Sequence, residues 1–142
     1  MEIRKLAIED YEKIIALWER ARLPYKPRGR DSKEEIAKQM EASPDFFIGS
    51  FEDNRLIGVA ILSSDMRKGW INHLAVDPDY RREGVAKTLI AESEKVLRKH
   101  GIKIFCVLIE DYNDVSKKLF KKRGYVEHHD IAYFSKRDSD DV

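Results

Sequence analysis

The segment Arg81-Arg82-Glu83-Gly84-Val85-Ala86 constrains the fold of this chain more than any other. It follows an apolar run, Trp70 to Val76, that is typical of a strand, and it opens an amphipathic run, Val85 to Lys99, that is typical of a helix. Between the two runs, Asp77-Pro78-Asp79 indicates a turn. A helix that opens on a glycine directly after a strand presents unpaired backbone N–H groups and the positive end of its dipole. We therefore predict an anion-binding turn at this point of the chain.

Two common phosphate-binding motifs are excluded by their glycines. The dinucleotide fingerprint requires three glycines at fixed offsets, whereas this segment contains only Gly84. The P-loop requires a glycine directly before its Lys-Ser/Thr pair, and Ala86 stands before Lys87-Thr88 instead. Arg81 and Arg82 add positive charge, and the missing side chain of Gly84 lets a bulky phosphate approach the backbone. The pattern predicts a pyrophosphate held mainly by main-chain N–H groups; the alternative is that Gly84 only permits a tight turn.

Two longer segments resemble motifs of one family. The segment Val76 to Ala86 resembles the acetyl-CoA-binding motif of the GNAT superfamily of N-acetyltransferases, in which Val-x-Pro-x-Tyr precedes Arg/Gln-x-x-Gly-x-Gly/Ala. The segment Asn113 to Tyr125 resembles the late motif of the same superfamily, Asn-x-x-Ala-x-x-Leu-Tyr-x-x-x-Gly-Phe. Three positions differ from the usual residues, since Ser116 replaces Ala, Phe120 replaces Tyr and Tyr125 replaces Phe.

The apolar pattern predicts an α+β fold with the order β-α-α-β-β-β-α-β-α-β. This order matches the GNAT fold, a mixed central β-sheet flanked by helices. We expect strands at 1–6, 46–51, 56–62, 70–76 and 102–109, one or two more strands within 126–136, and helices at 9–22, 31–43, 81–100 and 115–123. The continuous apolar run 102–109 predicts a central strand that is covered on both faces.

Several single residues predict where these elements begin and end. Asp53-Asn54 marks a hairpin, Asp31 or Ser32 caps the second helix, and Gly101 ends the long helix. The long helix is expected to bury a stripe of apolar side chains, namely Val85, Leu89, Val96 and Leu97. We expect residues 1–136 to form a single N-acetyltransferase domain and residues 137–142 to form a polar, acidic tail that frays.

The resemblance implies acetyl-CoA as the co-substrate, with its pantetheine arm between the strand of Leu74 to Val76 and the strand that ends near Ile109. One backbone N–H of the first strand would polarise the acetyl carbonyl. The residues expected to contact the cofactor are Leu74, Ala75, Val76, Arg81, Arg82, Glu83, Gly84, Val85, Ala86, Asn113, Ser116 and Phe120. Asn113 is also a good helix N-cap, and the two roles are compatible.

The catalytic groups of the superfamily are not all present. Many members use a tyrosine at the position of Phe120 to protonate the leaving thiolate, and phenylalanine has no proton to give. A thiol with a pKa of about 8.5 is a fair leaving group by itself, so Phe120 predicts a slower enzyme or a replacement acid. The tyrosines that offer a hydroxyl are Tyr112, Tyr125 and Tyr133, for each of which core or rim packing is the simpler interpretation.

A dedicated base is also missing, because Trp70 and Leu108 stand where some members place a glutamate. The remaining candidate bases are His73, Glu110 and Asp111. The alternative for His73 is a structural role within its strand, and the alternative for Glu110 and Asp111 is a solvated strand end. Deprotonating a lysine-like amine at pH 7 costs about 4–5 kcal/mol, whereas an α-amine costs about 1–1.5 kcal/mol. We therefore expect a weakly basic acceptor, either a protein α-amine or a small-molecule amine.

The end of the first helix and the loop that follows it are basic and include Tyr25. The basic residues of this region are Arg20, Arg22, Lys26, Arg28 and Arg30. They predict either a clamp for an acidic acceptor or an ordinary solvated loop. A second function class also fits the missing acid and base, namely an acyl-CoA-binding sensor module with little or no turnover.

Composition adds few constraints. A net charge of +1 gives no general attraction to nucleic acid, and no segment is apolar for long enough to span a membrane. The single cysteine, Cys106, fits a reducing compartment and is expected to be buried packing. The four histidines lack metal-ligand spacing, so no metal site is predicted. We expect a cytoplasmic protein, and the superfamily analogy suggests a homodimer.

Overall fold

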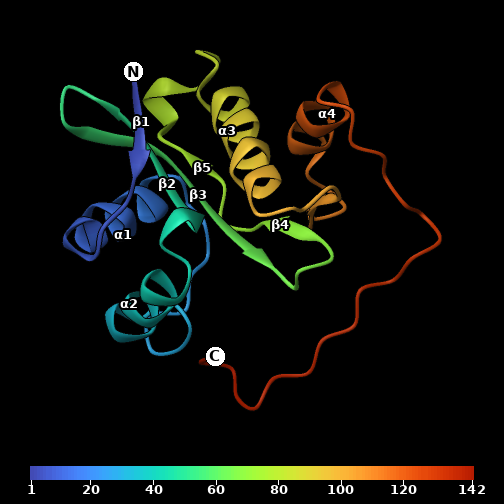
Figure 1. Cartoon of the computed structure of the whole chain (residues 1–142), viewed down its shortest axis with the longest axis horizontal. Helices are drawn as coiled ribbons and strands as arrows, with labels where there is room; N and C mark the ends of the chain where they lie inside the picture. Colours follow the sequence, from blue (N-terminus) through green and yellow to red (C-terminus); the bar gives the residue numbers. More distant parts are fainter.

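The long strand β3 organises the sheet in the computed structural model, which describes residues 1–142. It pairs antiparallel with β2 on one side and with both β4 and β5 on the other. The six-stranded sheet runs in the order β1-β2-β3-β4-β6, and β6 is parallel to β4 (Figure 1). The strands are β1 (Glu2–Lys5), β2 (Phe47–Glu52), β3 (Arg55–Ser64), β4 (Gly69–Ile71), β5 (Ala75–Val76) and β6 (Phe105–Val107). The predicted α+β fold with a mixed sheet is therefore confirmed.

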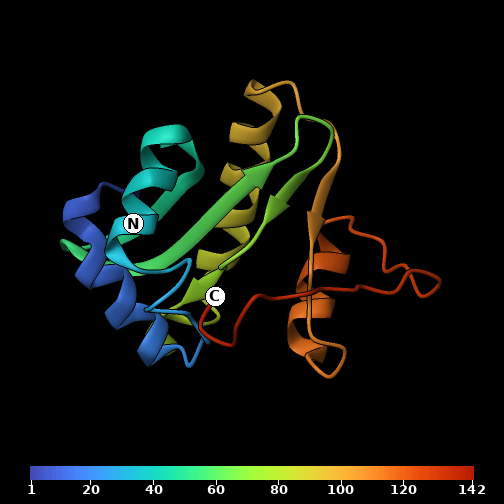
Figure 2. The same ribbon diagram turned by 90° about the horizontal axis from the view of Figure 1, so that it is seen from below.

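Helices cover both faces of this sheet. In Figures 1 and 2, α1 and α2 lie on one side of β3 and α3 lies on the other, while α4 lies near the β6 edge of the sheet. The helices are α1 (Tyr11–Arg20), α2 (Lys33–Ala42), α3 (Val85–Lys99) and α4 (Asp114–Lys122), with short 3-10 turns η1 (Ile8–Asp10), η2 (Pro44–Phe46) and η3 (Pro78–Tyr80). Each helix is too short or too polar to span a bilayer.

Two glycines allow α3 to lie close to the sheet. A Cβ atom on Gly58 would lie 2.8 Å from the side chains of Val85 and Leu89, and one on Gly69 would lie 2.7 Å from the side chain of Leu97. Such distances are shorter than packed carbon atoms tolerate. The missing side chains therefore set the separation between α3 and the sheet.

The predicted hairpin and helix caps are confirmed. Asp53 and Asn54 adopt φ values of 48° and 65°, as a tight hairpin turn requires. The Ser32 side chain accepts a hydrogen bond from the N–H of Glu35 at 3.2 Å and so caps α2. Gly101, with φ 81°, ends α3 through a hydrogen bond from its N–H to the carbonyl of Arg98.

The long helix differs from the expectation in two details. It begins at Val85 rather than Arg81, because η3 and a left-handed residue at Arg82 precede it. Its buried stripe includes Val85, Leu89 and Leu97 as expected, but Val96 is only partly buried and Ile90 and Ser93 are buried instead.

The predicted single strand at 70–76 is wrong, because β4 and β5 are separate strands. Both pair with β3, Ile71 opposite Leu62 and Ala75 opposite Val59. The segment 72–74 therefore has one residue more than the segment of β3 that it faces, which is a β-bulge. A regular apolar pattern does not reveal a single inserted residue.

The prediction of a covered central strand at 102–109 is also wrong. Only Phe105–Val107 form β6, which lies at the edge of the sheet and is half-buried. The side chains of Ile104 and Leu108 are 52% and 58% exposed. Cys106, expected to be buried, is accordingly only half-buried, and the partial burial raises the pKa of its thiol. No strand covers the outer edge of β6.

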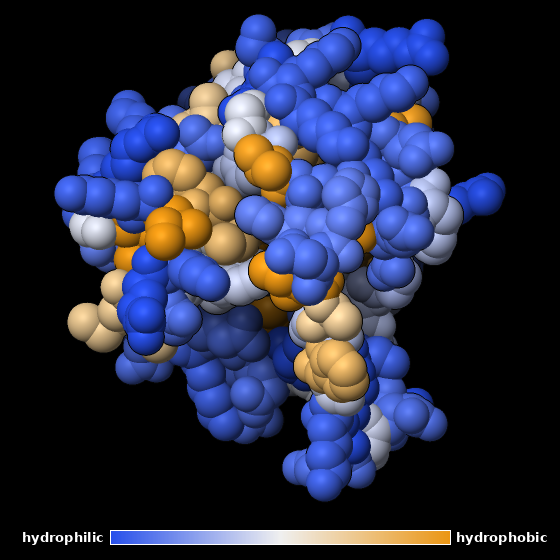
Figure 3. Space-filling model, turned by 90° about the vertical axis from the view of Figure 1, so that its right-hand side faces the viewer, coloured by the Kyte–Doolittle hydropathy of each residue, from blue (hydrophilic) through white to orange (hydrophobic).

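The predicted final strands within 126–136 are absent. Glu127 forms ion pairs with Lys117 and Lys121 on α4, at 3.0 and 2.9 Å, and these tie the start of the segment to α4 rather than to β6. Beyond Glu127 the chain forms an extended arm (red in Figures 1 and 2) that exposes apolar side chains. These side chains are Ile131, Tyr133 and Phe134. The face of the molecule that carries α4 shows several apolar areas between polar ones (Figure 3).

Candidate functional site

The predicted anion-binding turn presents a continuous row of unpaired backbone donors. The N–H groups from Arg81 to Lys87 have no acceptor within the protein, and the first intrahelical donor is the N–H of Thr88, which bonds to the carbonyl of Gly84 at 3.0 Å. Arg82 and Gly84 both take left-handed conformations, with φ 65° and φ 80°. Left-handed residues that alternate with ordinary ones turn successive N–H groups toward one concavity, which suits an anion.

The surroundings of Gly84 fit a pyrophosphate. No protein atom lies within 4 Å of the position that a Cβ on Gly84 would occupy, so the space in front of the turn is open. Arg81 and Arg82 are exposed and have no acidic partner within ion-pair distance. Their charges are therefore available to a ligand, and the Glu83 side chain is exposed as well. These residues can hold a diphosphate at the positive end of α3.

The turn is anchored by a buried carboxylate that sequence analysis treated only as part of the turn. Asp77, with 1% of its surface exposed, accepts hydrogen bonds from Arg20 Nε at 3.1 Å, Arg55 Nη2 at 2.9 Å and the N–H of Asp79 at 2.9 Å. Burial raises the pKa of Asp77, but the Asp79 N–H and the two guanidinium groups outweigh it and lower the pKa overall. Arg20 therefore supports the turn. The sequence groups Arg20 with the basic residues around the first loop, but Arg20 is the last residue of α1 and its guanidinium is bound to Asp77.

Strands β5 and β6 part next to this turn. Pairing between β4 and β6 ends at Ile71 and Val107, and β5 pairs only with β3. Because the N–H of Asp77 donates to Ile57 on β3, at 2.7 Å, the preceding N–H of Val76 points away from β3 into the gap. Leu74 and Val76 are partly exposed and Ala75 is buried. The parted strands that the sequence resemblance implied are present.

The bulge places His73 at this gap and turns its side chain toward α1. The His73 ring packs edge-on against Trp18, with ring centroids 4.8 Å apart, and Nδ1 lies 3.9 Å from Asp31 Oδ1. The N–H of His73 has no backbone partner. Burial lowers the pKa of His73 below 6.5, Arg30 adds to this effect, and Asp31 opposes it. His73 is therefore neutral at pH 7 and can accept a proton.

The other two candidate bases lie in different surroundings. Glu110 is exposed, and its carbonyl accepts a hydrogen bond from the N–H of Asn113 at 2.8 Å. Asp111 has a fully exposed side chain that forms an ion pair with Lys117 at 2.7 Å. Both carboxylates are exposed to solvent, whereas His73 is partly buried beside the parted strands. His73 is the better placed proton acceptor of the three.

The late motif forms the start and the core of α4. Asn113 caps the helix, since its side chain accepts a hydrogen bond from the N–H of Ser116 at 3.1 Å. Phe120 is buried, and its ring lies edge-on against Tyr125 at 5.0 Å. The Tyr125 hydroxyl donates to Glu94 on α3 at 2.8 Å, and burial together with Glu94 raises its pKa strongly. Of the other tyrosines considered as acids, Tyr112 and Tyr133 are exposed.

Known proteins share this architecture. The sequence profile of the acetyltransferase (GNAT) family matches residues 4–125. This chain belongs to that family. The acetyltransferase plu1384 of Photorhabdus laumondii is 32% identical over 138 residues, which cover 96% of this chain and 95% of the relative. The predicted assignment as an acetyltransferase is thereby confirmed.

Solved structures of GNAT acetyltransferases superpose over most of the chain. The PaiA N-acetyltransferase of Thermoplasma acidophilum, in complex with coenzyme A, matches with a TM-score of 0.75 and 28% identity over 86% of this chain and 87% of that chain. The aminoglycoside N-acetyltransferase AAC(6')-Iy matches with a TM-score of 0.77 and 20% identity over 96% and 97% of the two chains. At 20% identity, the likeness to AAC(6')-Iy shows the shared fold alone.

Proposed function

We propose that this GNAT acetyltransferase uses acetyl-CoA and transfers the acetyl group to a primary amine by direct attack of the amine. The observation that carries the proposal is the row of unpaired N–H groups from Arg81 to Lys87, directly after the strand that parts from β6. The likeness to the coenzyme A complex of Thermoplasma acidophilum PaiA supports the choice of cofactor.

Main-chain groups do most of the binding in this proposal. The N–H groups of Arg81 to Lys87 hold the pyrophosphate, and each charge-assisted hydrogen bond contributes about 1.5–3 kcal/mol. The free edge of Leu74 to Val76 pairs with the amides of the pantetheine arm, and Asn113 at the start of α4 borders the same region. The unpaired N–H groups of His73 and Val76 are the donors available to the carbonyl oxygen, on which negative charge grows during attack.

His73 acts as the general base in this proposal. Acetyl-CoA supplies the activated acetyl group. The amine nitrogen forms a C–N bond to the carbonyl carbon, the C–S bond breaks, and the sulfur keeps the electron pair. His73 takes the amine proton on Nε2, the ring nitrogen that does not face Asp31. Phe120 has no proton for the thiolate and Tyr125 donates to Glu94, so the thiolate leaves without a dedicated acid and is protonated by water.

The acceptor class follows from this base. A neutral histidine with a lowered pKa is a weak base, so it suits an amine that is already partly deprotonated at pH 7. We therefore infer that the acceptor is an α-amine or a small-molecule amine rather than a lysine side chain.

Thiol release from acetyl-CoA tests the proposal when it is measured beside calorimetry with coenzyme A. The acceptors are peptides with a free α-amine, an α-blocked lysine and a polyamine, at pH 7. We expect binding of coenzyme A and faster thiol release with α-amine peptides than with blocked lysine. Binding without release by any amine would favour an acyl-CoA sensor instead, and a clear preference for lysine would exclude the α-amine class. No affinity for coenzyme A would refute the proposal.

A further inference from the structure

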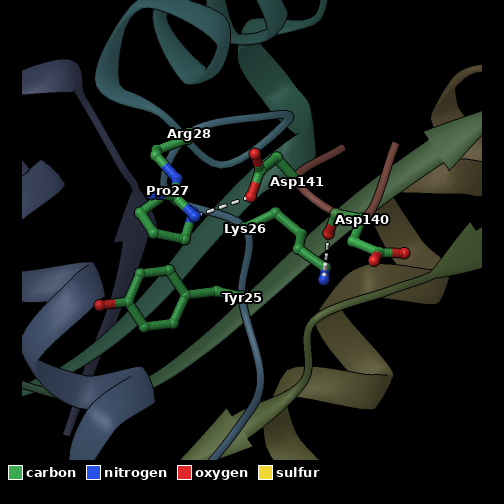
Figure 4. A pocket seen from close by; sticks show the side chains of 6 residues that line it. All are labelled: Tyr25, Lys26, Pro27, Arg28, Asp140 and Asp141. Atoms are coloured by element: carbon green, nitrogen blue, oxygen red, sulfur yellow. Dashed lines mark hydrogen bonds and ion pairs between the residues drawn. The ribbon is translucent and has the colours of Figure 1, made fainter. Parts of the chain in front are cut away.

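The C-terminal end of the chain is bound rather than frayed. In Figures 1 and 2 the arm leaves α4 and its end returns to the loop that joins α1 to α2. Lys26 Nζ donates to the carbonyl oxygen of Asp140 at 2.7 Å, and Arg28 Nη2 forms an ion pair with Asp141 Oδ1 at 2.8 Å (Figure 4). We call residues 140–142 the strap.

The strap packs against the main chain of the loop as well as its basic side chains. A Cβ on Gly29 would collide with the carbonyl oxygen of Asp141, so Gly29 makes room for the strap. Loop and strap together line a cavity of about 350 Å³, formed by Tyr25, Lys26, Pro27, Arg28, Asp140 and Asp141. The strap thus forms one wall of a space whose other wall is the loop.

This loop borders the bulge that carries His73. Trp18 contacts both the loop and the bulge, because its ring centroid lies 5.8 Å from that of Tyr25 and 4.8 Å from that of His73. Asp31 also links them, since one carboxylate oxygen accepts the N–H of Lys26 at 2.8 Å and the other lies 3.9 Å from His73 Nδ1. The loop that holds the strap is therefore connected to His73 through Trp18 and Asp31.

The charges of strap and loop are opposite. Arg20 at the end of α1 is engaged by Asp77, but the basic residues that follow α1 have no acidic partner in the body of the protein. Lys26 and Arg28 bind the strap, and Arg22 and Arg30 have no acidic side chain within ion-pair distance. The Arg28 and Asp141 side chains are 80% and 55% exposed, and ion pairs with this exposure are weak. An acidic ligand from solution can therefore replace the strap.

We propose that the loop 25–31 recognises peptide acceptors with acidic residues close to their N-terminal amine, and that the strap occupies this place until such a peptide displaces it. The inference rests on the proposed transfer to an amine. A peptide is the occupant that fits, because the loop binds a main-chain carbonyl of the strap through Lys26 and an acidic side chain through Arg28. The acceptor supplies both groups and in addition the amine that reacts.

Kinetics with matched peptides test the recognition. The acceptors are Ala-Glu-Asp-Leu, its uncharged counterpart Ala-Gln-Asn-Leu, and free glutamate. We expect kcat/KM for the acidic peptide to exceed that for the uncharged one about tenfold, through KM. In the double variant K26E/R28E this ratio falls to about one. Equal rates with both peptides would overturn the acidic preference, and equal use of free glutamate would overturn the peptide class.

Variants of the tail test the strap. A chain that ends at Lys136 should have a KM for the acidic peptide about two- to five-fold lower than the full chain, as expected for the loss of exposed contacts. Asp141→Asn should give part of this effect. Asp138→Asn is the matched control, because it removes the same charge from the tail at a residue that forms no hydrogen bond or ion pair. A synthetic peptide of residues 137–142 should inhibit the truncated protein competitively against the acidic peptide.

The two proposals fail in different ways. If coenzyme A binds and amines are acetylated, but truncation, Asp141→Asn and Asp138→Asn all leave KM unchanged, only the strap is refuted. If no peptide is acetylated and coenzyme A does not bind, the acetyl transfer itself is refuted.

Discussion

Replacing Gly84 by alanine separates ligand binding from backbone strain. Gly84 has φ 80° and opens α3, and Gly101 has φ 81° and ends it. No protein atom lies within 4 Å of an added Cβ at either position. Alanine in a left-handed conformation costs about 1–2 kcal/mol, so both substitutions should lower the free energy of unfolding by a similar amount. For a domain of this size we expect the melting temperature to fall by about 3–7 °C in each variant.

Only Gly84→Ala should weaken the binding of coenzyme A. Its Cβ would occupy open space next to the unpaired N–H groups of its neighbours, and Gly101 lies at the opposite end of α3. If the Cβ displaces the pyrophosphate enough to break one charge-assisted hydrogen bond, about 1.5–3 kcal/mol is lost, which is about 10- to 150-fold in Kd.

Calorimetry with coenzyme A and a thermal melt of each variant measure the two effects. The reasoning is refuted if Gly84→Ala keeps the wild-type Kd within about twofold while it melts as early as Gly101→Ala. An equal loss of affinity in both variants would mean that general destabilisation, rather than access to the N–H groups, controls binding.

Three further predictions concern the base, the anchor of the turn and the contact between α3 and the sheet. His73→Asn should lower kcat/KM by about 100-fold and remove the loss of activity that protonation of His73 causes below pH 6.5. Asp31→Asn should move that loss to lower pH, because Asp31 raises the pKa of His73. A wild-type pH profile in His73→Asn would exclude this base. Asp77→Asn should lower the free energy of unfolding by about 2 kcal/mol at pH 7. Since the folded pKa of Asp77 is below 3.8, its stabilisation is complete above that pH and is lost as the pH falls further, so denaturant melts of variant and wild type should converge below pH 3.8; a constant difference would contradict the charge-based role. Gly58→Val should cost about 1–3 kcal/mol in a denaturant melt, because its side chain meets Val85 and Leu89, and an unchanged midpoint would contradict the close packing.

Local chemistry made much of the fold predictable from the sequence. Asp53-Asn54, Ser32 and Gly101 each satisfy a conformational or hydrogen-bonding need within a few residues, and each is found in its expected role. The anion-binding turn belongs to the same class, because a helix start exposes N–H groups whatever the rest of the chain does. The position of Gly84 at the start of α3 was therefore accessible to sequence analysis.

Features that depend on distant contacts could not be predicted. The bulge exists because of how 72–74 face β3, and the pKa of His73 depends on burial beside Asp31, 42 residues earlier in the chain. The bound strap depends on Arg28 and Asp141, which are 113 residues apart in the sequence. The apolar run at 102–109 was misjudged because hydrophobicity does not distinguish a central strand from an edge strand whose neighbour is missing.

The inserted residue between β4 and β5 has a consequence for how this protein can evolve. Ile71 faces Leu62 and Ala75 faces Val59, so the two halves of the interrupted strand are out of phase by one position. Deleting one residue from 72–74 would restore the phase, allow a longer ladder and favour a more regular sheet. The same deletion would close the gap in which we propose that the thioester lies. The bulge is therefore expected to lower the stability of the sheet while it opens the gap, and it would persist only where selection acts on acetyl transfer as well as on stability.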